Sequence, residues 1–223
     1  MSTIFLIRHG ESEGNVDRNV YRTKPDHAIE LSELGKQQAI RAGKKLVKHV
    51  IPMDHHVSWW TSPYMRTRQT AAGVAQGFLE EAAILGGKPR NIRWCESINL
   101  VEQQYGLFDG IPDDDLPNEY PAEYAHYKKS EDFEGRFWAR MPLGESRFDV
   151  TLRTQQFANM LRNSDTIHVV VAHGVTIRAL VMNLCDHEWE WFEKEPNPEN
   201  ASIRMLSSFG YPSIAVADRG YVD

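Results

Sequence analysis

Cysteine is scarce in this chain, since the 223 residues include only Cys95 and Cys185. Two cysteines are too few for a disulfide framework, and they do not have the paired spacing of a zinc site. A long apolar run is also missing. The apolar stretch at residues 4–7 is too short for a signal peptide or a membrane span. We therefore expect a reduced, cytoplasmic protein with no membrane partner.

An excess of positive charge is missing as well. The chain has 25 Lys and Arg against 31 Asp and Glu, a formal net charge of −6. This balance argues against a nucleic-acid partner, because nucleic-acid-binding proteins normally present a basic face. It still permits a small anionic ligand, since a few cations focused in a cleft outweigh the global charge.

Apolar patterning predicts strands that alternate with helices. Short apolar or β-branched runs predict strands at residues 3–7, 57–60, 92–94 and 167–172. Apolar residues at helical spacing predict helices at residues 32–50, 148–161 and 175–184. A further helix is expected to begin with Ser62 as N-cap and Pro63 at its first position. This order predicts an α/β fold with three αβα layers and a mostly parallel sheet flanked by helices.

Residues 109–147 differ from the rest of the chain. They are rich in acidic and aromatic residues, include four prolines and show little periodicity. The number of aromatic side chains argues against disorder, because such side chains are poorly tolerated in water. We therefore expect a single domain over residues 1–223, with a lid inserted at about 109–147.

Two predicted strands end in the same dipeptide, at His9-Gly10 and His173-Gly174. In open α/β sheets the ligand site lies beyond the carboxyl ends of the strands, so the two histidines can converge there. Arg8 lies at the tip of an apolar strand, and Arg66 in the first turn of a predicted helix. A bound dianion would act as counter-ion for both. Taken singly, Arg8 is as well explained by a salt bridge and Arg66 by a surface position.

Four blocks of the sequence resemble the histidine phosphatase superfamily, the phosphoglycerate mutase-like proteins. The blocks are RHGESEGN at residues 8–15, SPYMRTRQT at 62–70, LVEQQYG at 100–106 and AHG at 172–174. They follow the family's order, and the resemblance extends from residue 4 to about 185. An isolated Arg-His-Gly is a weak signal, whereas four blocks in order are highly specific.

The resemblance implies a phosphoglycerate mutase-like fold and an enzyme that carries phosphate on a histidine, without a metal or other cofactor. It implies that His9 is the nucleophile, Glu102 the general acid and base, and His173 a stabiliser of the transition state. Phosphate-binding roles are implied for Arg8, Asn15, Arg66 and Gly174. Neighbouring cations would disfavour the imidazolium form of His9 and keep its nucleophilic nitrogen free.

The expected activity is phosphatase action on a small phosphorylated metabolite, with a phosphoglycerate mutase as the alternative. Mutases of the family follow the acidic residue with a basic stretch and carry a later Arg-Arg pair. Here Gln103 and Gln104 follow Glu102, and the chain contains no Arg-Arg pair. This departure favours the phosphatase.

A third possibility is a non-catalytic protein that binds a phosphorylated ligand, because some relatives lose the catalytic histidines. Against it, all six family positions are present, namely Arg8, His9, Asn15, Arg66, Glu102 and His173. Four cations in the inserted segment are candidates for reading a second anionic group or for plain surface charges: Lys128, Lys129, Arg136 and Arg140. The sequence leaves a homodimer open.

No metal site is expected from the remaining polar clusters. Asp54-His55-His56 and Asp186-His187-Glu188 have neither a helical histidine pair nor a cysteine partner at a suitable spacing.

Overall fold

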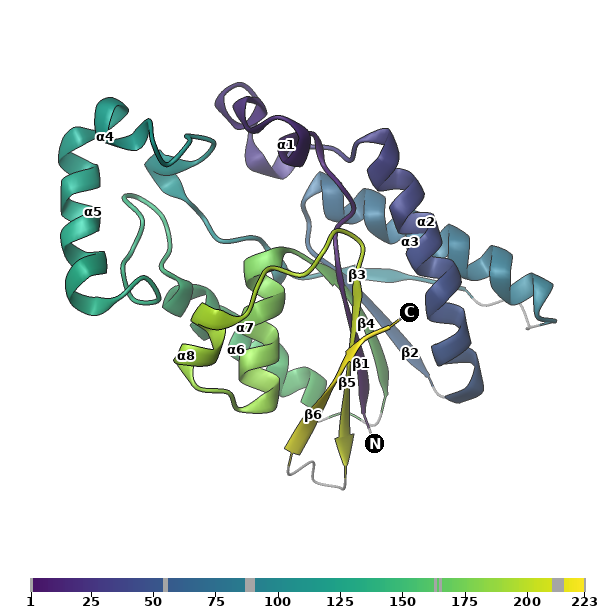
Figure 1. Cartoon of the computed structure of the whole chain (residues 1–223). Coiled ribbons are helices and arrows are strands. Elements are labelled where there is room, and N and C mark those ends of the chain that lie inside the picture. Colours follow the sequence, from purple (N-terminus) through teal and green to yellow (C-terminus); the bar gives the residue numbers. More distant parts are fainter. Residues whose placement is uncertain are drawn as a thin grey trace.

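A six-stranded sheet forms the centre of the molecule, with the strand order β3-β2-β4-β1-β5-β6 (Figure 1). The structure is a computed structural model and describes residues 2–53, 56–86, 91–162, 164, 166–209 and 215–222. The strands are β1 (Thr3–Arg8), β2 (Val57–Thr61), β3 (Trp94–Glu96), β4 (Ile167–Ala172), β5 (Ile203–Phe209) and β6 (Ala215–Tyr221).

Helices cover both faces of this sheet, which confirms the predicted three-layer α/β fold (Figure 1). On one face lie α2 (Glu33–Val50) and α3 (Met65–Ile84), and on the other α6 (Arg147–Arg162) and α7 (Gly174–Cys185). Shorter helices are α1 (Glu13–Val16), α4 (Leu116–Glu119), α5 (Pro121–Glu134) and α8 (Trp189–Lys194). Single 3₁₀ turns are η1 (Arg18–Arg22), η2 (Asp26–Ala28), η3 (Ile51–Met53), η4 (Ile98–Leu100) and η5 (Gly106–Phe108).

The central strand β1 divides its side chains between the two cores. Successive residues of a strand point to opposite faces, so Phe5 and Ile7 join the core beneath α2 and α3. Ile4 and Leu6 join the core beneath α6 and α7. All four side chains are at most 1% exposed, which explains why the run is uniformly apolar rather than alternating.

The sheet is parallel from β3 to β1, as predicted, and antiparallel from β1 to β6. The two C-terminal strands were not predicted. β5 mixes polar and apolar residues, so it lacks the continuous apolar run of the parallel strands. The third strand also begins later than expected, at Trp94 rather than residue 92, where Trp94 pairs with Trp59 of β2.

The start of α3 corrects one prediction. Ser62 is not the N-cap and Pro63 is not the first helical residue, because α3 begins at Met65 with Tyr64 as its N-cap. The Ser62 hydroxyl instead lies 2.9 Å from Nε2 of His173. The serine that looked like a helix signal is therefore part of the histidine cluster.

The position of α3 is set by close backbone contact with α2. A Cβ atom added at Gly77 would lie 2.0 Å from the carbonyl oxygen of Ile40, and one added at Gly43 would lie 2.2 Å from that of Val74. Only glycine permits this approach. The contact holds α3 against the sheet and its first turn, with Arg66, at the carboxyl edge of β2.

The segment at residues 109–147 stands apart from the sheet and carries α4 and α5 (Figure 1). It has a small apolar cluster of its own that includes Phe108, Leu116, Tyr127 and Met141. Its two ends are tied together by backbone hydrogen bonds. Leu107 N–H donates to the Pro142 carbonyl at 3.0 Å, and Glu145 N–H donates to the Gln104 carbonyl at 2.8 Å.

None of the helices in the described ranges is both long enough and apolar enough to cross a lipid bilayer. Both cysteines are free thiols, with Cys95 exposed and Cys185 half-buried.

Candidate active site

His9 and His173 meet beyond the carboxyl ends of β1 and β4. These strands are parallel neighbours in which Arg8 pairs with Ala172, so the residues that follow them are also adjacent. The two ring centroids are 5.3 Å apart, with the rings nearly edge to face. His9 is 4% exposed and His173 is fully buried.

Hydrogen bonding fixes which nitrogen of His9 is free. Its Nδ1 lies 2.7 Å from the carbonyl oxygen of Gly10. A carbonyl only accepts hydrogen bonds, so Nδ1 carries the proton and the lone pair is on Nε2. Burial, followed by the charges of Arg66 and Arg8, lowers the pKa of His9 well below its usual value. The ring is therefore neutral at neutral pH, with the lone pair of Nε2 unprotonated.

His173 is held by a serine and a tyrosine. Its Nε2 lies 2.9 Å from the Ser62 hydroxyl, and the Tyr64 ring packs edge-on at a centroid distance of 5.1 Å. Burial, followed by Arg66 and then His9, lowers the pKa of His173 well below the usual value. This imidazole is also neutral, so it can act by hydrogen bonding rather than by charge.

Two arginines flank the histidines and are anchored from behind. Arg8 donates through Nη1 to the Pro198 carbonyl at 2.6 Å, and burial lowers its pKa. Arg66 is 2% exposed and donates through Nη1 to both the carbonyl and the carboxylate of Asp26, each at 2.7 Å. These bonds hold each guanidinium in one orientation.

Three buried nitrogen atoms of this cluster have no hydrogen-bond partner within the described part of the chain. They are Nε of Arg8, Nε of Arg66 and Nδ1 of His173. Buried polar atoms are nearly always paired, because an unpaired one costs about 1–3 kcal/mol. Two of these atoms belong to cationic guanidinium groups, which are donors only, and such a set fits an anion with several acceptor oxygens. A phosphoryl group has that form.

Glu102 approaches the cluster from the loop that follows η4. Its carboxylate accepts hydrogen bonds from its neighbour Gln103 N–H at 3.0 Å and from Thr176 N–H at 3.3 Å. Thr176 lies in the first turn of α7, the helix that begins directly after His173. The same helix start therefore orients the carboxylate of Glu102. Glu102 lines the same cavity as His9.

The backbone beneath Glu102 is held by Arg153 of α6. Arg153 donates through Nη2 to the Glu102 carbonyl at 3.1 Å and through Nη1 to the Asn99 carbonyl at 2.9 Å. Its Nε forms an ion pair with Glu145 at 2.8 Å. Glu145 in turn accepts from Gln104 N–H at 3.0 Å. Arg153 and Glu145 therefore fix the loop that carries Glu102.

A cavity of about 570 Å³ opens onto these residues. The predicted residues that line it are Arg8, His9, Asn15, Arg66 and Glu102. The remaining two, His173 and Gly174, lie directly behind. A Cβ atom at Gly174 would be 2.9 Å from Oδ1 of Asn197, which lines the cavity. The structure thus brings together all seven residues that the sequence singled out.

A larger cavity of about 730 Å³ lies between α2 and residues 196–203, and none of the seven residues lines it. We place the site in the smaller cavity because His9 and both arginines line it, and the ring of His173 packs against that of His9.

Three residues of the site were not predicted: Asp26, Ser62 and Asn200. Asn200 donates through Nδ2 to the His9 carbonyl and to Oδ1 of Asn15, each at 3.1 Å. It belongs to the turn-forming run PNPEN at residues 196–200, directly before β5, which was the available signal. Asp26 follows a proline in a polar stretch and carries no distinctive pattern.

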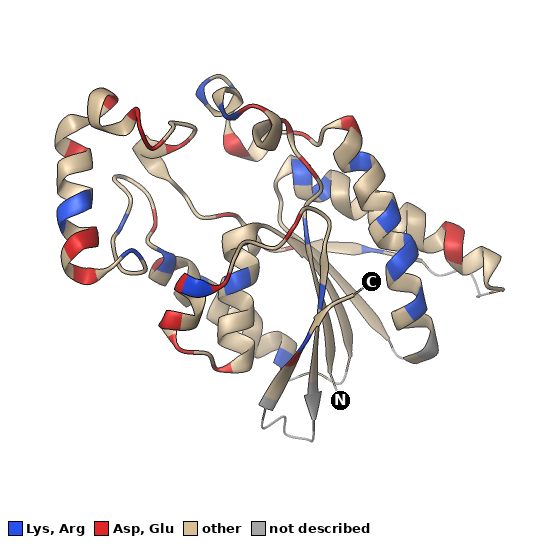
Figure 2. Cartoon of the chain, viewed as in Figure 1, with Lys and Arg blue, Asp and Glu red and all other residues tan. Residues whose placement is uncertain are grey.

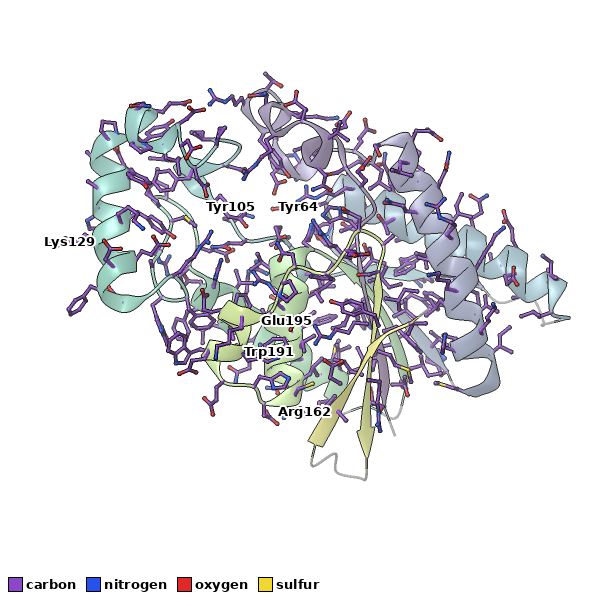
Figure 3. All side chains as sticks on the ribbon, viewed as in Figure 1. Tyr64, Tyr105, Lys129, Arg162, Trp191 and Glu195 are labelled. Atoms are coloured by element: carbon purple, nitrogen blue, oxygen red, sulfur yellow. The ribbon has the colours of Figure 1, made fainter. Side chains whose placement is uncertain are left out.

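The four cations of the inserted segment do not all face the cavity. Lys128 and Arg136 line it. Lys129 points outward from α5 (Figure 3) and is exposed, so it does not reach a ligand there. Arg140 forms an ion pair with Asp149 at 2.6 Å.

Within the described residues, no three His, Cys, Asp or Glu side chains are grouped so as to hold a metal ion. Asp54 and His55, considered above as possible ligands, lie outside the described residues.

Comparison with known proteins gives one family. The model of the histidine phosphatase superfamily (branch 1) matches residues 4–212. The phosphoglycerate mutase-like protein AT74 of Arabidopsis thaliana is 33% identical over 91% of this chain, which spans 64% of that protein. The broad-range acid phosphatase DET1 of Saccharomyces cerevisiae is 25% identical, with 91% of this chain and 84% of that protein aligned.

A 2,3-bisphosphoglycerate-dependent phosphoglycerate mutase of Bartonella bacilliformis is 30% identical, over 82% of this chain and 81% of that protein. Among solved structures, a mycobacterial glucosyl-3-phosphoglycerate phosphatase in complex with VO₃ has a TM-score of 0.71. It is 23% identical, with 99% of this chain and 98% of that chain covered, and so shares the fold.

Proposed function

The chain belongs to branch 1 of the histidine phosphatase superfamily, and on that premise we propose that it is a phosphomonoester phosphatase whose phosphohistidine forms on His9. The observation that carries the proposal is the group of unpaired buried donors on Arg8, Arg66 and His173 beside a neutral His9 with a free Nε2. This arrangement supplies both a nucleophile and a cradle for three phosphoryl oxygens.

In the proposed first step, Nε2 of His9 attacks phosphorus in line with the leaving oxygen. The P–N bond forms as the P–O bond breaks, and Glu102 protonates the departing alkoxide. In the second step a water molecule attacks phosphorus and gives a proton to Glu102, and the P–N bond breaks. Inorganic phosphate leaves, and His9 and Glu102 regain their starting protonation states.

The phosphoryl oxygens would be held by fixed donors. Arg8 and Arg66 offer Nε–H groups whose guanidinium planes are already anchored. We assign the Ser62 hydroxyl, 2.9 Å away, as the donor to Nε2 of His173. The proton of His173 would then be on Nδ1, which is buried without a partner among the described residues and so could bond a phosphoryl oxygen. We assign further contacts to Asn15 and to the backbone N–H of Gly174 at the start of α7. Donors that need no reorganisation stabilise the transition state most effectively.

We further infer that the reaction needs no metal, because the two guanidinium groups supply the positive charge that a metal ion would supply in other phosphoryl-transfer enzymes. We propose that residues 109–147 act as a lid over the cavity they line, within one domain.

A cytoplasmic location is proposed from the two free thiols. A homodimer remains a prediction that sedimentation analysis can test.

The alternative is a mutase, and one relative carries that name. The structure offers a reason to prefer hydrolysis. Gln103 and Gln104, which replace a basic stretch, are used for structure. Gln103 is 2% exposed and donates to the Glu145 carbonyl at 2.9 Å. Gln104 donates to the Tyr64 hydroxyl at 2.7 Å.

The test of the proposal is hydrolysis of para-nitrophenyl phosphate by the purified protein in EDTA. We expect turnover that resists the chelator and is inhibited by vanadate, which mimics the pentacoordinate phosphoryl group. A coupled assay for conversion of 3- to 2-phosphoglycerate should give a much lower rate. No hydrolysis of any phosphomonoester, or isomerisation faster than hydrolysis, would contradict the proposal.

The lowered pKa of His9 leads to a prediction about pH. We expect its ring to remain neutral as the pH falls from 8 to below 6.5, because protonation must overcome burial and the charges of Arg66 and Arg8. In Arg66→Met, one of these cations is removed and the pKa should rise toward the usual value. Nitrogen-15 NMR of labelled histidine reports the charge of the ring directly. A ring that titrates in the native protein at or above its usual value would contradict this account.

Arg153 is predicted to be a positioning residue for Glu102. In Arg153→Met we expect kcat/KM for an alkyl phosphate to fall by about 10-fold, because a displaced acid protonates the leaving oxygen poorly. The loss should be much smaller with para-nitrophenyl phosphate, whose leaving group needs no proton. Arg140→Met, which breaks the ion pair between the exposed Arg140 and Asp149 of α6, is the control. Equal losses for both esters would show that Arg153 acts only on stability.

A further inference from the structure

The cavity extends from the histidines into the inserted segment, where its wall is lined by rings. Tyr105, Phe108, Tyr124 and Tyr127 line this part, together with Met141. The Phe108 centroid lies 5.7 Å from that of Tyr127 and 6.5 Å from that of Tyr124. The cavity volume of about 570 Å³ is larger than a phosphoryl group requires. It is within the range of pockets that enclose whole small-molecule ligands. We call these four rings and Met141 the ring wall.

The same part of the cavity has no surplus of positive charge. Beyond the phosphoryl end, its charged lining consists of three cations and three acids: Arg18, Lys128, Arg136, Asp109, Asp113 and Glu131. Figure 2 shows one basic stretch on α5 with acidic positions on either side of it. Glu131 pairs with Lys128 and lies 3.9 Å from Nε of Arg136. A second anionic group on the substrate would have to break these pairs.

Tyr105 lies where the two parts of the cavity meet. Figure 3 places it, like Tyr64, between the inserted helices and the main body of the molecule. Burial, followed by the charge of Glu102, raises the pKa of Tyr105, so its hydroxyl stays protonated. Tyr105 therefore brings a neutral aromatic ring to the cavity that Glu102 also lines.

We infer that this phosphatase prefers phosphomonoesters of uncharged, ring-bearing alcohols, and that the ring wall selects them. The inference rests on the proposed function and names the substrate class of the same site. Aromatic rings stack against the rings of such a leaving group and exclude water from it. The balanced charges disfavour phosphoglycerate, because Lys128 and Arg136 are already paired with Glu131.

The inference can be tested with three primary alkyl phosphates: 2-phenylethyl phosphate, glycerol 3-phosphate and 3-phosphoglycerate. Their ester bonds have similar intrinsic reactivity, so differences in kcat/KM report recognition of the leaving group. We expect kcat/KM for 2-phenylethyl phosphate to exceed that for glycerol 3-phosphate by about 10-fold or more, as contact with several rings implies. 3-Phosphoglycerate should be the poorest substrate. Equal values for the three esters, or preference for 3-phosphoglycerate, would overturn the inference.

A matched pair of variants separates ring recognition from loss of structure. Tyr120 and Tyr124 both lie 6.5 Å from Phe108, but only Tyr124 lines the cavity. In Tyr124→Ala the preference for the phenylethyl over the glycerol ester should fall by about 2- to 10-fold. In Tyr120→Ala the preference should stay unchanged. Equal changes in the two variants would mean that the rings only stabilise the segment.

A gain-of-function variant tests the charge argument. Glu131→Gln removes the carboxylate that Lys128 and Arg136 share and, among the described residues, leaves Lys128 only its 3.7 Å contact with Asp132. The ratio of 3-phosphoglycerate to glycerol 3-phosphate hydrolysis should therefore rise by several-fold. An unchanged ratio would contradict the role assigned to the paired charges.

Binding of the three esters to the His9→Ala variant tests this inference independently of the proposed function, because the variant is expected to bind the esters without hydrolysing them. Calorimetric titration with the three esters should give the same order of affinities without any turnover. If the native protein hydrolyses none of the esters but the order holds, the phosphatase proposal fails and the ring preference stands. If hydrolysis is rapid but the order is reversed, only the ring preference fails.

Discussion

Replacing His9 with alanine should abolish hydrolysis, with kcat reduced by at least about 10⁴-fold, because no other group can form the covalent intermediate. His9 is the only one of the two neighbouring imidazoles whose hydrogen bond leaves Nε2 free, since Nε2 of His173 is taken by Ser62. Affinity for inorganic phosphate should be largely retained, because Arg8, Arg66 and His173 remain. Steady-state kinetics and phosphate titration measure the two quantities separately.

The matched control is His168→Ala. His168 is also a buried histidine of the central sheet, 4% exposed, and burial lowers its pKa to about 4. It bonds with Trp60 and Ser164 rather than with site residues. This variant should lose stability but keep most of its activity when folded. Comparable loss of kcat in the two variants would remove His9 from the chemistry.

Replacing Glu102 with glutamine should separate substrates by their leaving groups. For glycerol 3-phosphate we expect kcat/KM to fall by about 10²–10⁴-fold, the usual contribution of a positioned general acid. For para-nitrophenyl phosphate the fall should be less than about 10-fold, because nitrophenolate leaves without a proton. Glutamine retains the size of the side chain and can still accept the Gln103 and Thr176 hydrogen bonds.

The same variant should also show a burst. Glu102 is the proposed base for the attacking water, so hydrolysis of the phosphohistidine would become slower than its formation. Rapid mixing with para-nitrophenyl phosphate should then release about one equivalent of nitrophenol before the steady state. Equal losses for both esters with no burst would assign the proton transfers to another group.

The sequence predicts the parallel half of this fold well, because each strand there is a continuous apolar run. β4 matches its predicted bounds, and β1 and β2 each extend one residue further. β5 and β6 were missed because they mix polar and charged residues with apolar ones. Arg204 of β5 is an example, since it is 6% exposed yet charged, and pairs with Glu195 and Asp218.

The positions of the site residues follow from the sequence, but their supports do not. Two His-Gly strand ends and two arginines can be read directly, since local patterning places them at one edge of a parallel sheet. Asp26, which anchors Arg66, is 40 residues away along the chain. Asn200 is 191 residues from His9. Such contacts depend on how loops return to the sheet, and no local pattern encodes that.

Ser62 shows how a local signal can mislead. A Ser-Pro pair before an apolar helix is a common N-terminal pattern, yet here the serine is fully buried and bonded to His173. Tyr64 takes the N-cap position without a side-chain bond to the helix. The Ser62 hydroxyl bonds to the buried imidazole of His173 instead of capping the helix, because an unpaired buried polar group costs free energy.

The most direct test of the central claim is to trap the covalent intermediate. The native protein is mixed with a phosphorus-32-labelled phosphomonoester and quenched in alkali, and the labelled peptide is identified by mass spectrometry. We predict one phosphoryl group per chain on His9, stable to alkali, released by acid and absent from His9→Ala. A label on His173, on Glu102 or on a serine, or turnover with no covalent label at any time, would contradict the account.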